Sequence, residues 1–239
     1  MNQETKWLLN DKYNGIETDA FYDDVKRLES GEPLAYIIGW QPFCGTKIYL
    51  DSHPLIPRPE TEYWVKLVTD EIKEKKNVKV LDLCAGSGCI GIAILKNIPN
   101  STVDFVEIDE SHHATILKNV RENKINENRV KIVGGSLFEN VPDQYDIIVT
   151  NPPYIDPQLS DRIGESVLEY EPKNALFGGN AGMGLITKIL AQIPRFLRSG
   201  GILYIEHEPE QVQKIQELLP GIKSQKDQFG VARFSVYKY

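Results

Sequence analysis

"VKVLDLCAGSGCIGIAILKNI", residues 78–98, is the stretch that decides the fold. Its first part is a short apolar run rich in branched side chains, which is typical of a buried strand. Its last part is long and apolar enough to form a helix. Between them, Gly86, Gly88 and Gly91 match G-x-G-x-x-G, in which glycines allow a tight turn and the close approach of a ligand. A strand, a glycine loop and a helix in this order predict a nucleotide-binding unit in a parallel sheet.

The rest of the chain, up to the C-terminus, continues this alternation of apolar runs and amphipathic segments. Near-continuous apolar strands that alternate with helices indicate a parallel sheet covered on both faces. The connection "QFGV" before the last run is too short for a helical crossover, so we expect an antiparallel last strand. The expected strands are 78–85, 101–109, 129–136, 145–150, 200–208, 221–227 and 232–239, and the expected helices are 89–98, 112–123, 182–198 and 210–219.

Three domains or segments are predicted. Residues 1–33 are short, polar and helix-like, and "GEP" ends them. Residues 34–54 contain two apolar runs around a Pro-Phe-Cys-Gly turn, which predicts a β-hairpin linker. Residues 55–239 form the main domain, which begins with a proline-rich entry and a helix that has Glu60 and Glu62 in its first turn.

Composition and charge narrow the class of protein. The 239 residues suffice for one α/β domain and a small extra module. A net charge of -7 argues against a broad electrostatic grip on nucleic acid. The three cysteines show no CxxC spacing, so we expect reduced thiols without a metal site, in a cytoplasmic protein. The N-terminus lacks a signal-peptide profile, and no apolar run reaches the roughly 18 residues of a membrane span.

Two acidic residues accompany the glycine loop. Asp109 ends the next strand, about 20 residues on, where a carboxylate can accept both hydroxyls of a ribose. Asp82 lies inside the strand before the loop, and a buried carboxylate is costly without a partner. The cationic amino and sulfonium groups of S-adenosylmethionine would suit Asp82, whereas NAD would place its pyrophosphate on the helix N-terminus. The loop by itself leaves both nucleotides open, and a plain tight turn is the structural alternative.

The run "YDIIVT" stops abruptly at Asn151, Pro152, Pro153 and Tyr154. Ligands of open α/β sheets bind at the carboxyl ends of the strands, so this tetrapeptide is expected beside the reactive end of the cofactor. The side-chain oxygen of Asn151 and the carbonyl of Pro152 can together accept both N–H bonds of a planar NH2 group, and Tyr154 can stack on the same plane. The pattern therefore predicts a binding site for an amide or an exocyclic amine. The structural alternative is a rigid turn in which the tyrosine is packed.

These motifs resemble those of methyltransferases that act on planar nitrogens. "PLAYIIGWQPFCG", "LIPRPETE", "EPKNALFGG" and "IEHEPEQ" narrow the resemblance to the bacterial release-factor glutamine methyltransferases, known as PrmC or HemK. The resemblance extends from about residue 31 to the C-terminus. It implies a Rossmann-like class I methyltransferase fold and transfer of a methyl group from S-adenosylmethionine. The implied acceptor is the glutamine side-chain amide in the Gly-Gly-Gln loop of peptide chain release factors.

The resemblance also assigns residues. The implied acceptor site is Asn151, Pro152, Pro153 and Tyr154, and the implied donor site is the loop Cys84, Ala85, Gly86, Ser87 and Gly88 together with Asp109. We expect Asp82, Leu137 and Asn151 to complete the donor site. The chain departs from the family at Cys84, where glycine is usual, and at Ser136 and Leu137, where an acid and an aromatic residue are frequent. Its helical segment 1–33 is also much shorter than the usual N-terminal domain of the family.

Three other functions fit parts of the sequence. An adenine methyltransferase would use the same tetrapeptide but would usually carry a basic recognition segment, which we do not find. A donor-binding scaffold would have no use for an amine holder. An NAD-dependent oxidoreductase would need a proton-handling group, for which His207 is the candidate, although a lone histidine after a strand is more often structural.

Overall fold

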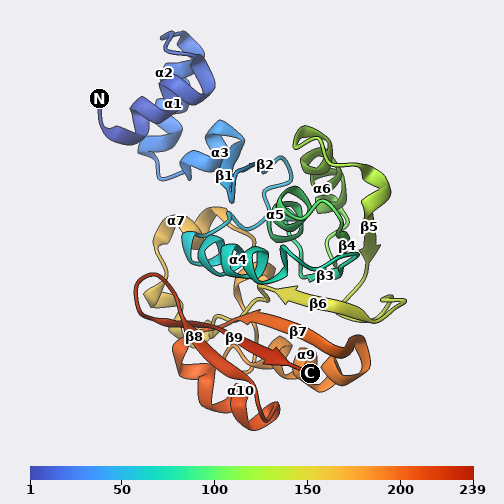
Figure 1. Ribbon diagram of the computed structural model, residues 1–239. Helices are drawn as coiled ribbons and strands as arrows, with labels where there is room; N and C mark the ends of the chain where they lie inside the picture. The colour runs from blue at the N-terminus through green and yellow to red at the C-terminus, as the bar shows by residue number, and fades with distance from the viewer.

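A seven-stranded sheet forms the centre of the molecule in the computed structural model, which describes residues 1–239 (Figure 1). The strand order is β5-β4-β3-β6-β7-β9-β8. The first five strands in this order run parallel, and β9 pairs antiparallel with both β7 and β8. The mostly parallel sheet with an antiparallel last strand is therefore confirmed. The bounds are β3 (Lys79–Leu83), β4 (Thr102–Glu107), β5 (Val130–Gly134), β6 (Tyr145–Thr150), β7 (Leu197–Glu206), β8 (Lys223–Lys226) and β9 (Ala232–Lys238).

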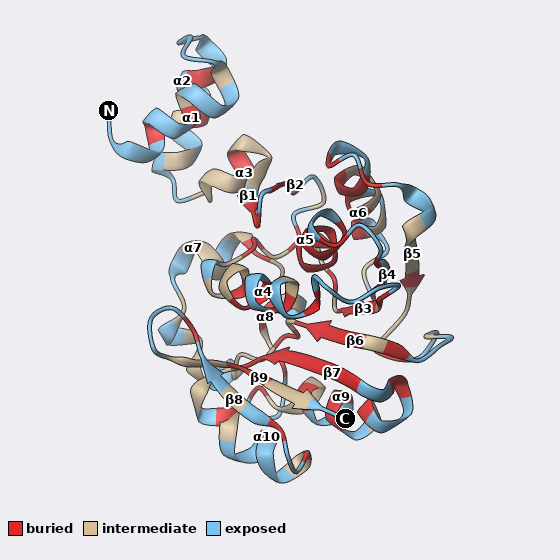
Figure 2. Ribbon diagram, in the orientation of Figure 1, coloured by how far each residue is buried: buried red, intermediate tan, exposed pale blue.

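Helices cover both faces of this sheet, as the alternation predicts. Val80 of β3 lies in one hydrophobic cluster, whereas Leu81 and Leu83 lie in the other, because successive side chains of a strand point to opposite faces. Figure 2 shows β6 and β7 buried along most of their length. The first cluster includes α4 (Pro59–Ile72), α5 (Cys89–Asn97) and α6 (Ser111–Glu122), and the second includes α9 (Gly184–Phe196) and α10 (Val212–Leu218).

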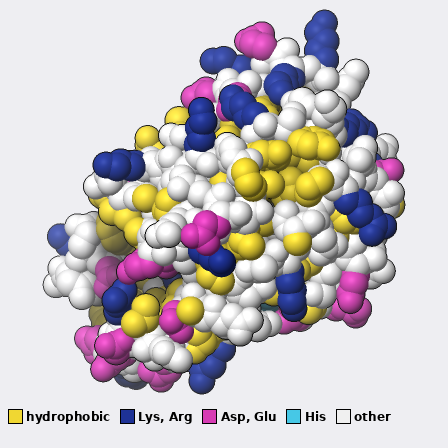
Figure 3. All heavy atoms as spheres, turned by 90° about the horizontal axis from the view of Figure 1, so that it is seen from below, with side chains coloured by type: hydrophobic (Ala, Val, Ile, Leu, Met, Phe, Trp, Pro, Cys, Tyr) yellow, Lys and Arg dark blue, Asp and Glu magenta, His cyan; other side chains and the backbone are white.

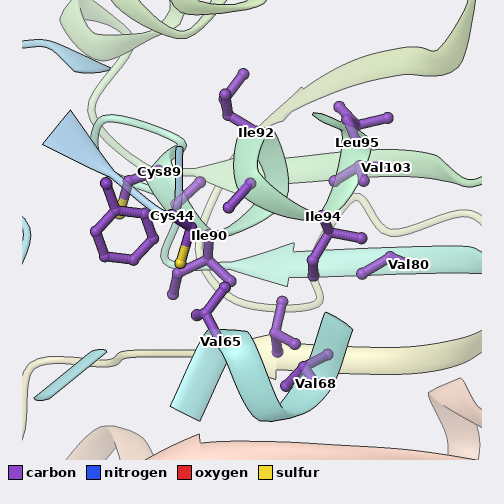
Figure 4. Close-up of a cluster of buried hydrophobic side chains, with 14 of the residues drawn as sticks. Cys44, Val65, Val68, Val80, Cys89, Ile90, Ile92, Ile94, Leu95 and Val103 are labelled. Atoms are coloured by element: carbon purple, nitrogen blue, oxygen red, sulfur yellow. The ribbon is translucent and has the colours of Figure 1, made fainter. Parts of the chain in front are cut away.

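The first cluster fastens the glycine loop to the sheet. In Figure 4, Val65 and Val68 of α4 point toward Ile90 and Ile94 of α5. Gly91 of α5 lies so close to β4 that an added Cβ would stand 2.3 Å from the ring of Phe105. The third glycine of the motif is therefore required for helix–strand packing.

The N-terminal helices form a small separate cluster at the blue end of the chain (Figure 1). α1 (Gln3–Tyr13) and α2 (Asp19–Glu29) begin at the capping side chains of Asn2 and Thr18. Their core is Leu8, Phe21 and Ile37, so part of the segment predicted as hairpin belongs to this cluster.

The expectation that the hairpin starts at residue 34 is wrong. Residues Leu34–Ile38 form the short helix α3, which begins after Pro33 and ends at Gly39 with a φ of 88°. A left-handed glycine is a strong helix terminator, and here it overrides the strand preference of the branched side chains. The hairpin itself is shorter, with β1 (Trp40–Phe43) and β2 (Thr46–Tyr49).

Asn119 of α6 and Asn123, which follows the helix directly, hold the hairpin against the main domain. Asn123 bonds both the N–H and the carbonyl of Lys47, and Asn119 does the same for Tyr49. Asn119 also donates to the carbonyl of Ser87 at 2.9 Å. The hairpin and the glycine loop are thus tied to the same side chain.

Between β6 and α9 the chain forms short helical pieces that the sequence analysis left unassigned. They are η2 (Pro157–Arg162), α7 (Glu165–Tyr170) and α8 (Lys173–Leu176). None of the helices combines the length and apolarity that crossing a bilayer requires. On the face shown in Figure 3, basic and acidic side chains are interspersed with hydrophobic ones, without a continuous basic surface.

Candidate functional site

A cavity opens at the carboxyl edge of the sheet, where β3, β4, β5 and β6 end. The loops after these strands supply most of its lining, which the parallel topology brings together from four separate parts of the chain. The lining residues are Leu55, Cys84, Gly86, Val106, Glu107, Ile108, His112, Gly135, Ser136, Leu137, Asn151, Pro153, Asn174, Ala175 and Leu185.

Glu107 is the carboxylate of this cavity. Its Oε2 accepts from the Gly86 amide at 2.7 Å, and its Oε1 accepts from the Asp109 amide at 2.8 Å. Each oxygen keeps a further lone pair, and two adjacent acceptors match the vicinal hydroxyls of a ribose. Glu107 is therefore placed to bind a nucleoside.

Asp109, the expected ribose ligand, does not line the cavity. Its Oδ1 accepts from the Ser111 amide at 3.0 Å at the start of α6, and these hydrogen bonds lower the pKa of the carboxyl group. The reason is that β4 ends at Glu107, so Asp109 lies past the strand. The sequence analysis missed Glu107, and the signal that could have found it is its place as the last residue of the strand.

Asp82 lies beneath the glycine loop, with none of its surface exposed, and it does not line the cavity. Its Oδ2 accepts from the Gly91 amide at 2.8 Å, whereas its Oδ1 has no partner. Burial raises the pKa of Asp82 to about 8. The side chain therefore holds the start of α5 through its bond to Gly91, and it makes no direct contact with a ligand in the cavity.

The glycine loop contributes Cys84 and Gly86 to the lining. Ala85 is bonded through its amide to the Val106 carbonyl, and buried Ser87 and Gly88 form the turn into α5. Ala85, Ser87 and Gly88 thus shape the loop without lining the cavity.

Cys84 has a φ of 62° and Leu137 a φ of 49°, and both side chains belong to the lining. Left-handed backbone at residues other than glycine is strained and tends to cluster at functional sites. Leu137 and the exposed Ile108 offer apolar surface for a planar base. Phe138 stacks on Phe196 in the core and is not available to a ligand.

The Asn-Pro-Pro-Tyr tetrapeptide lies at the opposite wall. Asn151 and Pro153 line the cavity, and Pro152 is buried between them. The Pro152 carbonyl accepts no backbone N–H, and the only hydrogen bond of the Asn151 side chain is donated by its Nδ2 to Thr61 at 3.2 Å. Two acceptor oxygens, Asn151 Oδ1 and the Pro152 carbonyl, are therefore left for a ligand.

Tyr154 departs from its expected place. Its phenol donates to Glu206 Oε1 at 2.9 Å, and its ring lines a neighbouring hollow with Leu159 and Met183. In this arrangement the ring does not stack within the cavity that Asn151 lines. Burial and the adjacent carboxylates raise the pKa of Tyr154, so the phenol stays protonated.

Glu206, at the end of β7, accepts hydrogen bonds from three side chains. Its Oε2 accepts from Thr61 Oγ1 and Trp64 Nε1, both at 2.7 Å, and its Oε1 accepts from Tyr154. Burial raises the pKa of Glu206, while the three donors and then the charge of Arg233 oppose this shift. The carboxylate joins α4 to the tetrapeptide.

Close backbone packing fixes the tetrapeptide from the other side. A Cβ on Gly178 would lie 2.4 Å from the Pro153 carbonyl oxygen, and one on Gly182 would lie 2.0 Å from that of Tyr154. Glu171 accepts from Arg58 at 2.6 Å and from the Ile56 amide at 3.0 Å, which fastens the segment that carries Leu55. The "LIPRPETE" and "EPKNALFGG" stretches are thereby joined at the rim of the cavity.

His207 is structural. Its Nε2 bonds Ser235 Oγ and its Nδ1 the Glu208 carbonyl, and burial lowers its pKa. It does not line the cavity, so the oxidoreductase interpretation loses its proton-handling group. No group of three or more His, Cys, Asp or Glu side chains is arranged to bind a metal ion.

Solved structures similar to this chain are methyltransferases. The catalytic domain of hMettl16, in complex with the MAT2A 3'UTR hairpin 6, superposes with a TM-score of 0.63 at 16% identity over 81% of this chain and 76% of that chain. SMU.776, complexed with SAH, gives a TM-score of 0.55 at 14% identity over 76% of this chain and 49% of that chain. These similarities establish the Rossmann-like methyltransferase fold.

Sequence comparison narrows the relationship. Residues 63–179 match the family "Methyltransferase small domain". The release factor glutamine methyltransferase of Francisella tularensis is 41% identical over 199 residues, which cover 82% of this chain and 69% of the relative. That of Lactococcus lactis is 34% identical over 211 residues, which cover 88% of this chain and 77% of the relative. The chain belongs to the family of the release factor glutamine methyltransferases.

Proposed function

We propose that this protein transfers a methyl group from S-adenosylmethionine to the side-chain amide nitrogen of the glutamine in the Gly-Gly-Gln loop of peptide chain release factors. The observation that carries the proposal is the pair of unpaired acceptors, Asn151 Oδ1 and the Pro152 carbonyl, at the wall of the cavity that Glu107 lines. Family membership supports the same substrate. The proposed setting is translation termination in the cytoplasm, where reduced cysteines are usual.

The residues of the cavity suit the methyl donor. Glu107 would accept the ribose hydroxyls, and Ile108 and Leu137 would contact the adenine. Gly86 lets the donor approach the backbone closely. A cationic group bound above the loop would favour the ionised form of Asp82, whose Oδ1 has no partner in the protein. A pyrophosphate would find no Lys or Arg side chain among the lining residues, which favours this donor over NAD.

The tetrapeptide would orient the acceptor. S-adenosylmethionine supplies a methyl group on a sulfonium sulfur, so that the C–S bond breaks as the C–N bond forms, and one proton leaves the nitrogen. An amide nitrogen is a poor nucleophile because its lone pair is delocalised into the carbonyl. Asn151 and Pro152 would hold both N–H bonds, aim the nitrogen and favour positive charge on it. The N-methylated amide cation is strongly acidic, so no strong base is required.

An adenine acceptor would present the same NH2 group to Asn151 and Pro152. The net charge of -7 argues against a broad electrostatic attraction of nucleic acid. We therefore favour a protein acceptor. The hairpin β1–β2, the "EPKNALFGG" stretch and the N-terminal helices are the proposed docking elements.

The test is methylation of a purified release factor with isotope-labelled S-adenosylmethionine, followed by mass analysis of the peptides. One added methyl group on the Gly-Gly-Gln glutamine is expected, and a release factor with that glutamine replaced by asparagine is the control. Label on DNA or RNA with none on the release factor would overturn the proposal.

A further inference from the structure

We propose that Thr61 and Glu206 are positioning residues that fix the direction of the Asn151 amide, so that its oxygen faces the acceptor. The inference deepens the proposed function and rests on it for the identity of the acceptor. The observation behind it is a chain of hydrogen bonds from Glu206 Oε2 through Thr61 Oγ1 to Asn151 Nδ2, with distances of 2.7 and 3.2 Å.

The direction of this chain follows from the donors available. In its ionised form Glu206 only accepts hydrogen bonds, so Thr61 donates its single hydroxyl proton to Glu206. The Thr61 oxygen can then only accept from Asn151, and the atom of the amide that donates is Nδ2. The amide oxygen is left as the acceptor. Without this chain, a flipped amide would present N–H groups to the N–H groups of the substrate.

Glu206 also tethers the other end of the tetrapeptide. Its Oε1 accepts from the phenol of Tyr154, while Trp64 Nε1 donates to the same Oε2 as Thr61. One carboxylate therefore holds Asn151 indirectly and Tyr154 directly, and two prolines of fixed φ lie between them. The position of the Pro152 carbonyl is set by the same anchors.

Neither positioning residue contacts the reacting groups. Glu206 is 1% exposed and Thr61 is 2% exposed, and neither lines the cavity. Water has little access to replace the lost bond if the chain is broken. Thr61 belongs to the "LIPRPETE" stretch and Glu206 to "IEHEPEQ". Both stretches therefore contribute a residue that positions the Asn151 amide.

The first test compares Thr61→Val with Thr61→Ser in single-turnover methylation at saturating donor. Valine keeps the shape but removes the hydroxyl, and we expect turnover to fall on the order of 10- to 100-fold, as for a misplaced catalytic group. Serine restores the hydroxyl and should stay within about 3-fold of wild type by the same reasoning. Donor affinity should be unchanged in both variants. Ser101→Ala is the control, because it removes another buried hydroxyl, 1% exposed, at the opposite edge of the sheet, and it should leave turnover unchanged.

The second test does not depend on the substrate. Side-chain 15N NMR of the protein alone should show the Asn151 NH2 protons in contact with the Thr61 methyl group, with slow solvent exchange. Thr61→Val should speed this exchange, and Thr61→Ser should not. An unchanged Asn151 NH2 signal in a folded Thr61→Val, or full turnover in that variant, would overturn the positioning role. If wild type fails to methylate the release factor, the proposed function falls, while the NMR comparison still decides the direction of the amide.

Discussion

The amide of Gly86 donates a 2.7 Å hydrogen bond to Oε2 of Glu107, which joins the glycine loop to the last residue of β4. The loop and the acid that follows it are therefore one unit, and removing the acid also leaves a loop N–H without its partner.

Glu107→Ala should weaken binding of S-adenosylmethionine by about 2 kcal/mol, roughly 30-fold in Kd, because hydrogen bonds to a charged group are lost. Asp109→Ala is the matched control. Asp109 accepts a hydrogen bond from the Ser111 amide outside the cavity, so its removal should change the Kd little. Titration calorimetry measures both, and a larger loss in Asp109→Ala than in Glu107→Ala would reverse our assignment.

Asn151→Ala should lower turnover on the order of 100- to 1000-fold, because one preorganised acceptor is lost. Binding of the donor should fall much less. Single-turnover methylation of the release-factor glutamine at saturating donor gives the rate. A variant that keeps more than about a third of the wild-type rate would contradict the amide-holding role, since loss of such a group normally costs far more.

Asp82 should make stability depend on pH. The folded protein keeps this proton up to a pH of about 8, whereas the unfolded chain releases it near pH 4. The folded state therefore binds more protons between these values, and the free energy of unfolding falls as the pH rises through that window. Asp82→Asn cannot titrate and should flatten the decline. Urea unfolding of both proteins at pH 5 and pH 8 measures the difference, and equal slopes would refute the prediction.

Gly182→Ala should disturb the tetrapeptide. Gly182 has a φ of 76°, and a Cβ there would meet the Tyr154 carbonyl oxygen at 2.0 Å. We expect a loss of about 2 kcal/mol in the free energy of unfolding, together with reduced turnover. Gly164→Ala is the control, because its φ is -60° and no atom lies within 4 Å of an added Cβ. Chemical denaturation of the two variants should separate them clearly.

Deletion of residues 1–30 should raise the KM for intact release factor and leave turnover nearly unchanged, the pattern of lost uniform binding. These residues form α1 and α2, which lie away from the cavity lining. Because the deletion also uncovers Ile37, circular dichroism should first confirm that the truncated protein is folded. An unchanged KM would show that the two helices do not dock the substrate.

The parts of the site that depend on local sequence were predictable. The glycine loop follows its strand, and Asn151 stands at the carboxyl end of β6, because apolar runs and prolines mark these boundaries. The choice between Glu107 and Asp109 depended on where β4 ends, and a strand boundary two residues earlier changes which side chain faces the cavity. The run Leu34–Ile38 looked like a strand, but a left-handed Gly39 closes it as a helix.

The parts that depend on distant contacts were not predictable. Thr61 and Glu206 are 145 residues apart in sequence, and no pattern in the sequence around either residue predicts their contact. The place of Tyr154 follows from the same contact, because the phenol turns toward Glu206 and away from the cavity. Hydrogen bonds between residues far apart in the sequence leave no pattern in the sequence around either residue.

Both edges of the hairpin β1–β2 are poorly suited to strand addition. On the β2 edge, the side-chain amides of Asn119 and Asn123 form hydrogen bonds with the main-chain N–H and carbonyl groups of Tyr49 and Lys47. On the β1 edge, Pro42 stands opposite Lys47 and has no N–H to offer. Strand addition by another polypeptide is therefore disfavoured on both edges, which leaves mainly the side chains of the hairpin to discriminate between partners.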